Sequence, residues 1–205
     1  MIDVRHKDGL TVLTINRPDK ANALTRDMLS SLADAVESAA DSIETRALII
    51  TGTGKVFSAG ADLDAAKAGL ATDPIWERLS GAVAACPVLT IAALNGTAAG
   101  GALGMVLAAD LRVASPETKF FYPVMTLGFL PQPSDPVRLE ALVGPARAKL
   151  ILTTGASVMA DQALAIGLVD MVDEVPLTSA HNLAAPALAA NREHVVVIKS
   201  MIPNS

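Results

Sequence analysis

The sequence is poor in charged residues, and this scarcity is its clearest compositional feature. Only 18% of the 205 residues are Asp, Glu, Lys or Arg, compared with about a quarter in an average soluble domain. A chain with so few charges either builds a thick core or places part of its surface against another subunit. The net charge of −5 argues against a nucleic-acid-binding protein, although it leaves room for a local basic patch that meets phosphates.

The sequence also lacks a second cysteine, clustered histidines and a long apolar run. Cys86 is the single cysteine, so no intrachain disulfide can form, which is consistent with a reducing compartment. The three histidines are scattered without metal-ligand spacing, and no metal site is predicted. The longest run of apolar residues and glycine, 98–109, is shorter than the about 20 residues that cross a bilayer. Since the first residues show no apolar signal region, we expect a soluble, cytoplasmic protein without membrane insertion.

The order of apolar and amphipathic segments predicts an α/β protein. Strands alternate with helices, and periodicity alone favours a doubly wound sheet. Helical spacing follows Thr25, a candidate N-cap. The C-terminal part is alanine-rich and helical in pattern, with breaks expected at Pro176 and Pro186. Strands are predicted at 10–15, 47–51, 88–94, 111–114, 119–122 and 169–172, and helices in the second half of 65–85 and at 100–109, 134–143, 145–154 and 160–167.

Two glycine- and alanine-rich segments follow predicted strands. Residues 57–63 come after the apolar run 47–51, and residues 95–104 come after the run 88–94. Small residues allow backbone N–H groups to approach a ligand closely. Two such groups that converge on one oxygen form an oxyanion hole. Either segment alone could instead be a tight turn that serves packing.

Further motifs accompany these two segments over residues 1–175. They are Asn16-Arg17-Pro18, Asn22-Ala23-Leu24, Ala109-Asp110-Leu111-Arg112, Leu127-Gly128-Phe129-Leu130-Pro131, Arg138-Leu139, Val143-Gly144 and the run 163–170. In order and spacing, the set resembles the crotonase superfamily, the enoyl-CoA hydratase/isomerase family. The resemblance implies a crotonase-like spiral of ββα units over 1–175. It also implies a C-terminal helical region at 176–205 that is shortened relative to the family's arm.

The resemblance implies a site for an acyl-CoA thioester. Ala61 and Gly101 match the positions whose backbone N–H groups form the family's oxyanion hole. Asp62 follows the first donor and is expected to serve the backbone of its loop. Arg17 is a candidate for binding the CoA phosphates. The positions that match the family's coenzyme A contacts, mostly through backbone atoms, are Lys20, Asn22, Ala23, Ala59, Asp62 and Leu63.

The proton-transfer groups of the family do not match. Its two glutamates align with Gly104 and Val124, and an aspartate of some isomerase and dehalogenase relatives aligns with Gln132. None of these three side chains can act as a general base. Asp135, Glu140 and Tyr122 are the remaining candidates, and Glu140 is expected to be a solvated residue of the predicted helix. Asp135 either caps the next helix or points into the site, and Tyr122 either lines the acyl pocket or donates a proton or hydrogen bond.

These residues predict an enzyme of the hydratase/isomerase class that acts on an acyl- or enoyl-CoA thioester through a stabilised enolate. Efficient hydration is not expected, because both family glutamates are absent. A non-catalytic acyl-CoA-binding protein and a truncated, non-functional paralogue are the alternatives. Coenzyme A is expected only as part of the substrate, without a separate cofactor. The low charge fraction and the resemblance predict a homotrimer or a dimer of trimers.

Overall fold

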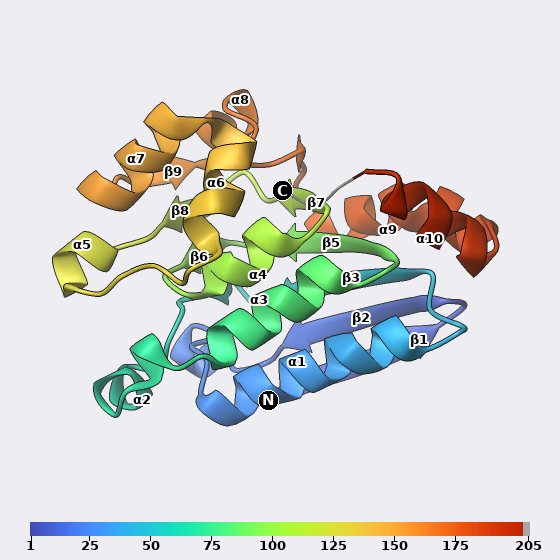
Figure 1. The fold of residues 1–205 in the computed structure, drawn as a ribbon, viewed down its shortest axis with the longest axis horizontal. Helices are drawn as coiled ribbons and strands as arrows, with labels where there is room; N and C mark the ends of the chain where they lie inside the picture. Colours follow the sequence, from blue (N-terminus) through green and yellow to red (C-terminus); the bar gives the residue numbers. More distant parts are fainter. Residues whose placement is uncertain (203–205) are drawn as a thin grey trace.

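The computed structural model describes residues 1–202, which form two β-sheets enclosed by helices (Figure 1). The larger sheet has the strand order β1-β2-β3-β5-β7-β10, and the smaller has the order β4-β6-β8-β9. The strands are β1 (Ile2–Lys7), β2 (Leu10–Ile15), β3 (Ala47–Gly52), β4 (Val56–Ser58), β5 (Leu89–Leu94), β6 (Thr97–Ala99), β7 (Leu111–Ala114), β8 (Lys119–Phe121), β9 (Val158–Met159) and β10 (Met171–Val172).

The helices cover both faces of the larger sheet. On one side α1 packs against α3, α3 against α4, and α4 against α6, while α9 lies on the other side against β3, β5 and β7 (Figure 1). The helices are α1 (Arg26–Asp41), α2 (Leu63–Lys67), α3 (Ile75–Ala85), α4 (Ala102–Ala108), α5 (Val124–Leu127), α6 (Asp135–Val143), α7 (Pro145–Thr154), α8 (Ala160–Ala165), α9 (Pro176–Ala189) and α10 (Arg192–Ser200), with 3-10 turns η1 (Pro18–Lys20) and η2 (Leu70–Thr72).

The chain repeats a ββα unit, as the resemblance implies. In each unit a longer strand (β3, β5 or β7) joins the larger sheet, and a short strand (β4, β6 or β8) joins the smaller one. One or more helices follow before the next unit begins. Neighbouring units pair in parallel in both sheets. The expected spiral α/β fold is therefore confirmed, and a single doubly wound sheet is not formed.

Burial on both faces explains why the central strands are continuous apolar runs. In β3, Leu48 and Ile50 belong to the core beneath α1 and α3, whereas Ile49 belongs to a second cluster with Ala180 and Ala184 of α9. A strand that is covered on one face only would alternate apolar and polar residues. Small alanine side chains let α9 lie close to the sheet.

Three local predictions at the chain's two ends had different outcomes. Thr25 is the N-cap of α1, because its hydroxyl accepts a hydrogen bond from the Met28 N–H at 3.3 Å. Pro176 occupies the start of α9, where its missing N–H costs nothing. The break predicted at Pro186 is wrong, since this proline lies inside α9 and the helix continues to Ala189. Packing of the preceding turn against the sheet holds α9 together despite the lost hydrogen bond.

Neither a membrane-spanning helix nor a metal-binding cluster is found within residues 1–202. No helix there combines the length and the hydropathy that a bilayer crossing requires. No group of three or more His, Cys, Asp or Glu side chains in that range lies close enough to hold a metal ion. The division into a core at 1–175 and a helical region at 176–205 stays a prediction, and positions 203–205 lie outside the described residues.

Candidate active site

The two glycine-rich segments meet where β4 and β6 end. These strands run parallel, with Val56 opposite Thr97, so their carboxyl ends lie at the same edge of the smaller sheet. Gly60 has φ +89°, and a Cβ atom on it would lie 2.7 Å from the Ala99 carbonyl oxygen. Only glycine allows this close backbone approach. Gly100 also has a positive φ, of +55°, and the next residue of each segment emerges at the shared edge.

The candidate oxyanion donors are the N–H groups of Ala61 and Gly101. The neighbouring backbone groups are occupied: Leu24 N–H donates to Gly60 C=O, and Gly100 N–H donates to Phe121 C=O. Within residues 1–202, neither the Ala61 N–H nor the Gly101 N–H donates to a protein acceptor. Both residues are only half-buried. The edge therefore presents two backbone donors without a protein acceptor among the described residues, and donors of this kind stabilise a developing oxyanion.

Trp76 of α3 forms the wall behind Gly101. A Cβ atom on Gly101 would lie 3.0 Å from the indole ring, so this position has no room for a side chain. The indole N–H donates to the Leu70 carbonyl oxygen at 2.8 Å, which fixes the ring. A valine at position 101 would therefore strike Trp76, in addition to any effect on an approaching carbonyl group.

Asp135 occupies the space beside Gly104. A Cβ atom on Gly104 would lie 3.0 Å from Oδ1 of Asp135, so the carboxyl group fills the place that a side chain at position 104 would need. Gly101 and Gly104 are three residues apart at the start of α4, and residues at this spacing are neighbours on one helix face. The Asp135 carboxyl group therefore lies about one helical turn from the candidate donor at Gly101.

The two oxygens of Asp135 have different surroundings. Oδ2 accepts a hydrogen bond of 2.8 Å from the Tyr122 hydroxyl. Oδ1 is buried and has no hydrogen-bond partner within the described residues. Asp135 as a whole residue is only 1% exposed. An unpartnered, buried carboxylate oxygen is costly, and such atoms in a native structure call for an explanation.

Burial shifts the titration of both Asp135 and Tyr122. Burial raises the pKa of Asp135 to about 6, against the opposing effects of the Tyr122 hydrogen bond and of Arg138, while Glu77 adds to the rise. Burial, followed by the nearby charge of Asp135, also raises the pKa of Tyr122. At neutral pH Tyr122 is a neutral hydrogen-bond donor, and Asp135 is a carboxylate that is more basic than usual.

The structure distinguishes between the two interpretations of Asp135. Asp135 is the first residue of α6, but Ser134 is the N-cap residue, and the Ser134 side chain makes no capping hydrogen bond. The prediction that Asp135 caps the helix is wrong, because its side chain turns toward Tyr122 and Gly104 instead. Gln132 is also buried, and its amide nitrogen donates to the Ala71 carbonyl oxygen.

Two residues that match coenzyme A positions are used by the protein itself. The Asn22 side chain accepts from the Arg17 N–H at 2.8 Å and donates to the carbonyl oxygens of Thr53 and Val56 at 2.9 and 2.6 Å. Asp62 accepts from two N–H groups at the start of α2 and pairs with Arg17 at 2.8 Å. The hydrogen bond from Arg17 is the main reason why the pKa of Asp62 is lowered. Arg17 is thereby committed to Asp62 and to a backbone carbonyl.

The other predicted coenzyme A positions lie around the edge of the same loops. Lys20, Ala59 and Leu63 are exposed, and Ala23 is half-buried. The N–H groups of Ala23 and Ala59 donate to Lys20 and Ala21 carbonyl oxygens. Their remaining exposed surface is available to a ligand, and their roles stay predictions.

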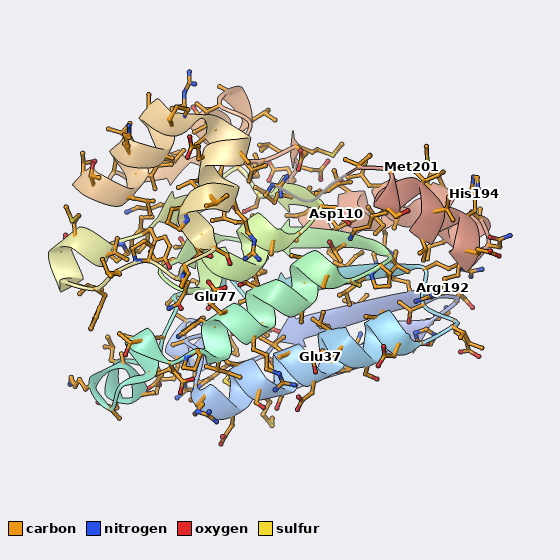
Figure 2. All side chains as sticks on the ribbon, viewed as in Figure 1. Glu37, Glu77, Asp110, Arg192, His194 and Met201 are labelled. Atoms are coloured by element: carbon orange, nitrogen blue, oxygen red, sulfur yellow. The ribbon has the colours of Figure 1, made fainter. Side chains whose placement is uncertain are left out.

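Sequence reasoning missed Trp76 and Glu77 on α3. Glu77 accepts two hydrogen bonds from Ser134, which is 57 residues further along the chain. The helical periodicity of α3 was the only local feature of the sequence around Glu77. Periodicity cannot indicate a contact with a residue as distant in sequence as Ser134. Figure 2 shows Glu77 between the start of α3 and the start of α6.

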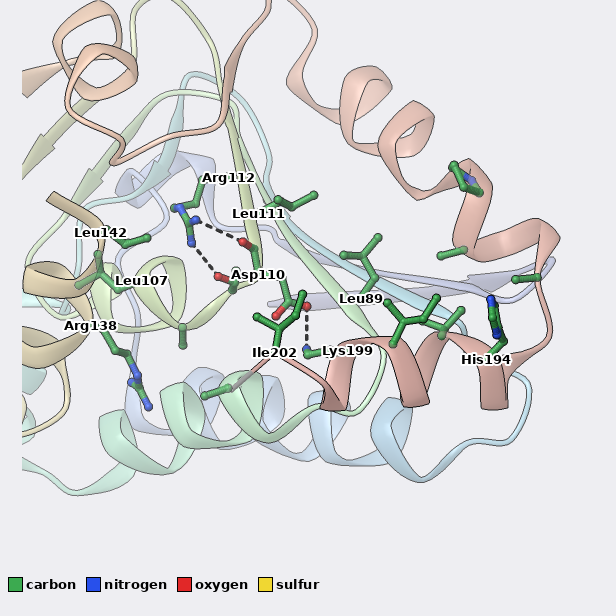
Figure 3. Close-up of a pocket in the computed structure, with 18 residues that line it drawn as sticks. Leu89, Leu107, Asp110, Leu111, Arg112, Arg138, Leu142, His194, Lys199 and Ile202 are labelled. Atoms are coloured by element: carbon green, nitrogen blue, oxygen red, sulfur yellow. Dashed lines mark hydrogen bonds and ion pairs between the residues drawn. The ribbon is translucent and has the colours of Figure 1, made fainter. Parts of the chain in front are cut away.

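A cavity of about 750 Å³ lies elsewhere, between α4, α6 and α10 (Figure 3). Its lining is mostly apolar, and Lys199 Nζ forms an ion pair there with Asp110 Oδ2 at 2.7 Å. Ala61, Gly101 and Asp135 do not line it. We place the candidate site at the glycine-rich edge because free donors and the perturbed carboxyl group are found there.

Comparisons with known proteins agree with this fold. The sequence profile of the family described as enoyl-CoA hydratase/isomerase matches residues 5–204. The chain belongs to the enoyl-CoA hydratase/isomerase family, that is, to the crotonase superfamily.

Individual relatives show how close the similarity is. "Probable enoyl-CoA hydratase EchA14" of Mycobacterium tuberculosis is 39% identical over 197 residues, which are 93% of this chain and 77% of the relative. Crotonyl-CoA hydratase of Syntrophomonas wolfei is 37% identical over 83% of this chain and 68% of its own length. The crystal structure of enoyl-CoA hydratase/isomerase from Pseudoalteromonas atlantica superposes with a TM-score of 0.90 at 31% identity, over 98% of this chain and 81% of that one.

Proposed function

We propose that the chain binds an acyl- or enoyl-CoA thioester and stabilises its enolate at Ala61 and Gly101. The support is the pair of N–H groups that have no protein acceptor within residues 1–202, together with family membership. When a proton leaves the α-carbon, negative charge moves onto the thioester oxygen. Two donors that are already in place lower the cost of this charge in a site from which water is excluded. Coenzyme A enters only as part of the substrate.

The observation that carries the catalytic part of the proposal is the position of Asp135 Oδ1 beside Gly104. This oxygen has no hydrogen-bond partner within the described residues, and burial raises the pKa of the Asp135 carboxyl group to about 6, which suits a general base near neutral pH. In the proposed step the carboxylate takes the α-proton, and the C–H electron pair forms the enolate. Asp135 then returns the proton either to the α-carbon or, for a 3-enoyl thioester, to the γ-carbon with a shift of the double bond.

A single base favours α-proton exchange and double-bond isomerisation over hydration. Hydration needs one group to activate water and one to protonate the α-carbon. The two positions that resemble the family's glutamates hold Gly104 and Val124 here, and neither side chain can transfer a proton. Tyr122 donates its hydrogen bond to Asp135, and its raised pKa makes it a weak acid. Its proposed role is to orient Asp135.

One observation favours a second candidate, a non-catalytic acyl-CoA-binding protein. Asp135 is almost completely buried, so a substrate reaches it only if side chains beside Gly104 give way. This candidate shares the thioester site and differs only in the chemistry. Proton exchange at the α-carbon therefore distinguishes the two.

Calorimetry of an acyl-CoA and of its free fatty acid tests the binding part. We expect the thioester to bind at least about tenfold more tightly, because the two N–H donors and the adenine and phosphate groups add contacts that the acid lacks. A dethia analogue, in which a methylene group replaces the thioester sulfur, serves as a control that keeps the carbonyl group. Equal affinity for the acyl-CoA and the free acid would contradict the site.

A further inference from the structure

Glu77 links α3 to the residue that precedes Asp135. Its carboxylate accepts from the Ser134 N–H at 2.9 Å and from the Ser134 hydroxyl at 2.7 Å. Ser134 is the N-cap residue of α6 and offers no side-chain cap of its own. Both hydrogen bonds are between a charged acceptor and a neutral donor, which are stronger than bonds between neutral groups. The start of α6 is therefore tied to α3.

The same helix α3 contacts the other parts of the candidate site. Trp76 lies behind Gly101, and the Cβ atom of Ser80 is 3.5 Å from where a Cβ on Gly104 would be. One rigid element thus touches the oxyanion segment, the gap at Gly104 and, through Glu77, the backbone beside Asp135. Precise placement of a base requires this kind of support from neighbouring residues.

The charge of Glu77 acts on Asp135 as well. A carboxylate in the first turn of a helix is ordinarily stabilised as an anion by the helix N-terminus. Here the Glu77 carboxylate lies at the same helix end and opposes ionisation of Asp135. The charged and titratable groups that act on Asp135 are Tyr122 from the end of β8, Arg138 from α6 and Glu77 from α3.

We propose that Glu77 is a positioning residue for Asp135. It holds Ser134 so that Oδ1 of Asp135 faces Gly104, and it places a second negative charge at the same helix end. This inference rests on the proposed function, because Asp135 is the group that is positioned. It assigns Glu77 two separable effects. One is geometric, through Ser134, and the other is electrostatic, through its charge.

Two variants separate these effects. Glu77→Gln keeps an acceptor oxygen for Ser134 and removes the charge, and Ser134→Ala removes the hydroxyl contact and keeps the charge. Glu140→Gln is the matched control, because Glu140 is an exposed carboxylate on the same helix α6. The Asp135 titration is followed by carbon-13 NMR of labelled aspartate carboxyl groups, without substrate. The resonance is assigned by its loss in Asp135→Asn.

We expect Glu77→Gln to move the Asp135 midpoint to lower pH, because a repelling negative charge is gone. The acid limb of α-proton exchange should move by the same amount. Ser134→Ala should leave the midpoint in place and reduce the rate at saturating substrate with little change in KM. Glu140→Gln should change neither quantity. Rescue of the rate in Ser134→Thr, which restores a hydroxyl, would support the geometric effect.

An unchanged Asp135 midpoint in a folded Glu77→Gln variant overturns the electrostatic part, and an unchanged saturating rate in Ser134→Ala overturns the geometric part. If Glu77→Gln does not fold, Glu77→Asp replaces it; this variant keeps the charge and shortens the reach, so its exchange rate must fall. The NMR titration needs no turnover. Absence of α-proton exchange in the unmodified chain would therefore count against the proposed function. The NMR titration would still show whether Glu77 affects the ionisation of Asp135.

Discussion

At the scale of single residues, the candidate site depends on a carboxyl group from α6 that occupies the space left by a glycine on α4. Gly104 leaves a gap on α4, and Asp135 fills it from α6. Both residues were identified from the sequence. Their contact could not be predicted, because α4 and α6 come together only in the folded chain. Sequence reasoning left Asp135 between a helix cap and the site for the same reason. For Glu77, helix periodicity was the only local signal, and it could not indicate the contact with Ser134.

The raised pKa of Asp135 predicts a conflict between stability and activity. A carboxyl group whose pKa rises from 3.8 to about 6 on folding favours the folded state only while it is protonated. Its stabilising contribution is complete below about pH 4 and is lost as the pH rises through about 6. Asp135→Asn removes this ionisation and keeps an oxygen for the Tyr122 hydrogen bond. We therefore expect the variant to be more stable at pH 8 by about 1–3 kcal/mol.

Urea denaturation at pH 8 and at pH 4 measures this difference. The gain should shrink to less than about 1 kcal/mol at pH 4, where the unmodified Asp135 is protonated in the folded state. Glu140→Asn provides the control for charge removal on the exposed side of α6. A variant that is less stable than the unmodified chain at pH 8 would mean that the Asp135 carboxylate is well solvated or paired in solution.

At the scale of elements, apolar runs predicted β2, β3, β5 and most helices, whereas β1 and the short strands β4 and β6 were missed. The predicted strand 47–51 is β3, and the predicted helices 134–143 and 145–154 are α6 and α7 within one residue. Strands β4 and β6 have three residues each, too few to show alternation. The glycine-rich segments that overlap them were nevertheless recognisable in the sequence, because a close approach of two backbone segments requires small residues at the contact.

The contact between the ends of β4 and β6 predicts a specific effect of Gly60→Ala. The new methyl group would lie 2.7 Å from the Ala99 carbonyl oxygen, at a residue with φ +89°. The two segments must separate, so we expect loss of at least about 2 kcal/mol of stability and at least about tenfold weaker acyl-CoA binding. Gly69→Ala is the control, because Gly69 also has a positive φ, of +104°, but no atom lies within 4 Å of its added methyl group.

Thermal unfolding and calorimetry of both variants check this prediction. Gly69→Ala should cost only the backbone strain, about 1 kcal/mol, and should bind acyl-CoA normally. If Gly60→Ala binds the thioester as tightly as Gly69→Ala does, the junction of the two segments is not part of the binding site.

At the scale of the whole molecule, the predicted homotrimer agrees with the apolar side chains that the single chain leaves exposed. Leu130, which precedes α6, is 85% exposed, and Met201, which follows α10, is 76% exposed. Isolated exposed apolar residues are ordinary, but several more accompany them on α5, α7 and α10. We expect light scattering to give three or six times the mass of the chain at micromolar concentration. A stable monomer would contradict this prediction.

The overall architecture was predictable because the family motifs follow one another along the chain in the family's order. Periodicity alone suggested a single doubly wound sheet, whereas the chain forms two sheets. Periodicity reports which faces are buried, but it does not say which of two sheets a strand joins. The relation between Asp135, Tyr122 and Gly104 depends on that assembly. It therefore required the structure.

The central claim, that Asp135 is the proton-transfer group of a thioester site, is tested most directly by α-proton exchange. The protein is incubated with a saturated acyl-CoA in deuterated water, and loss of the α-proton signal is followed by NMR across pH 5 to 8. We predict exchange that rises through about pH 6 and falls at least about a hundredfold in Asp135→Asn, while acyl-CoA binding is kept. Exchange that is equally fast in Asp135→Asn would contradict the claim.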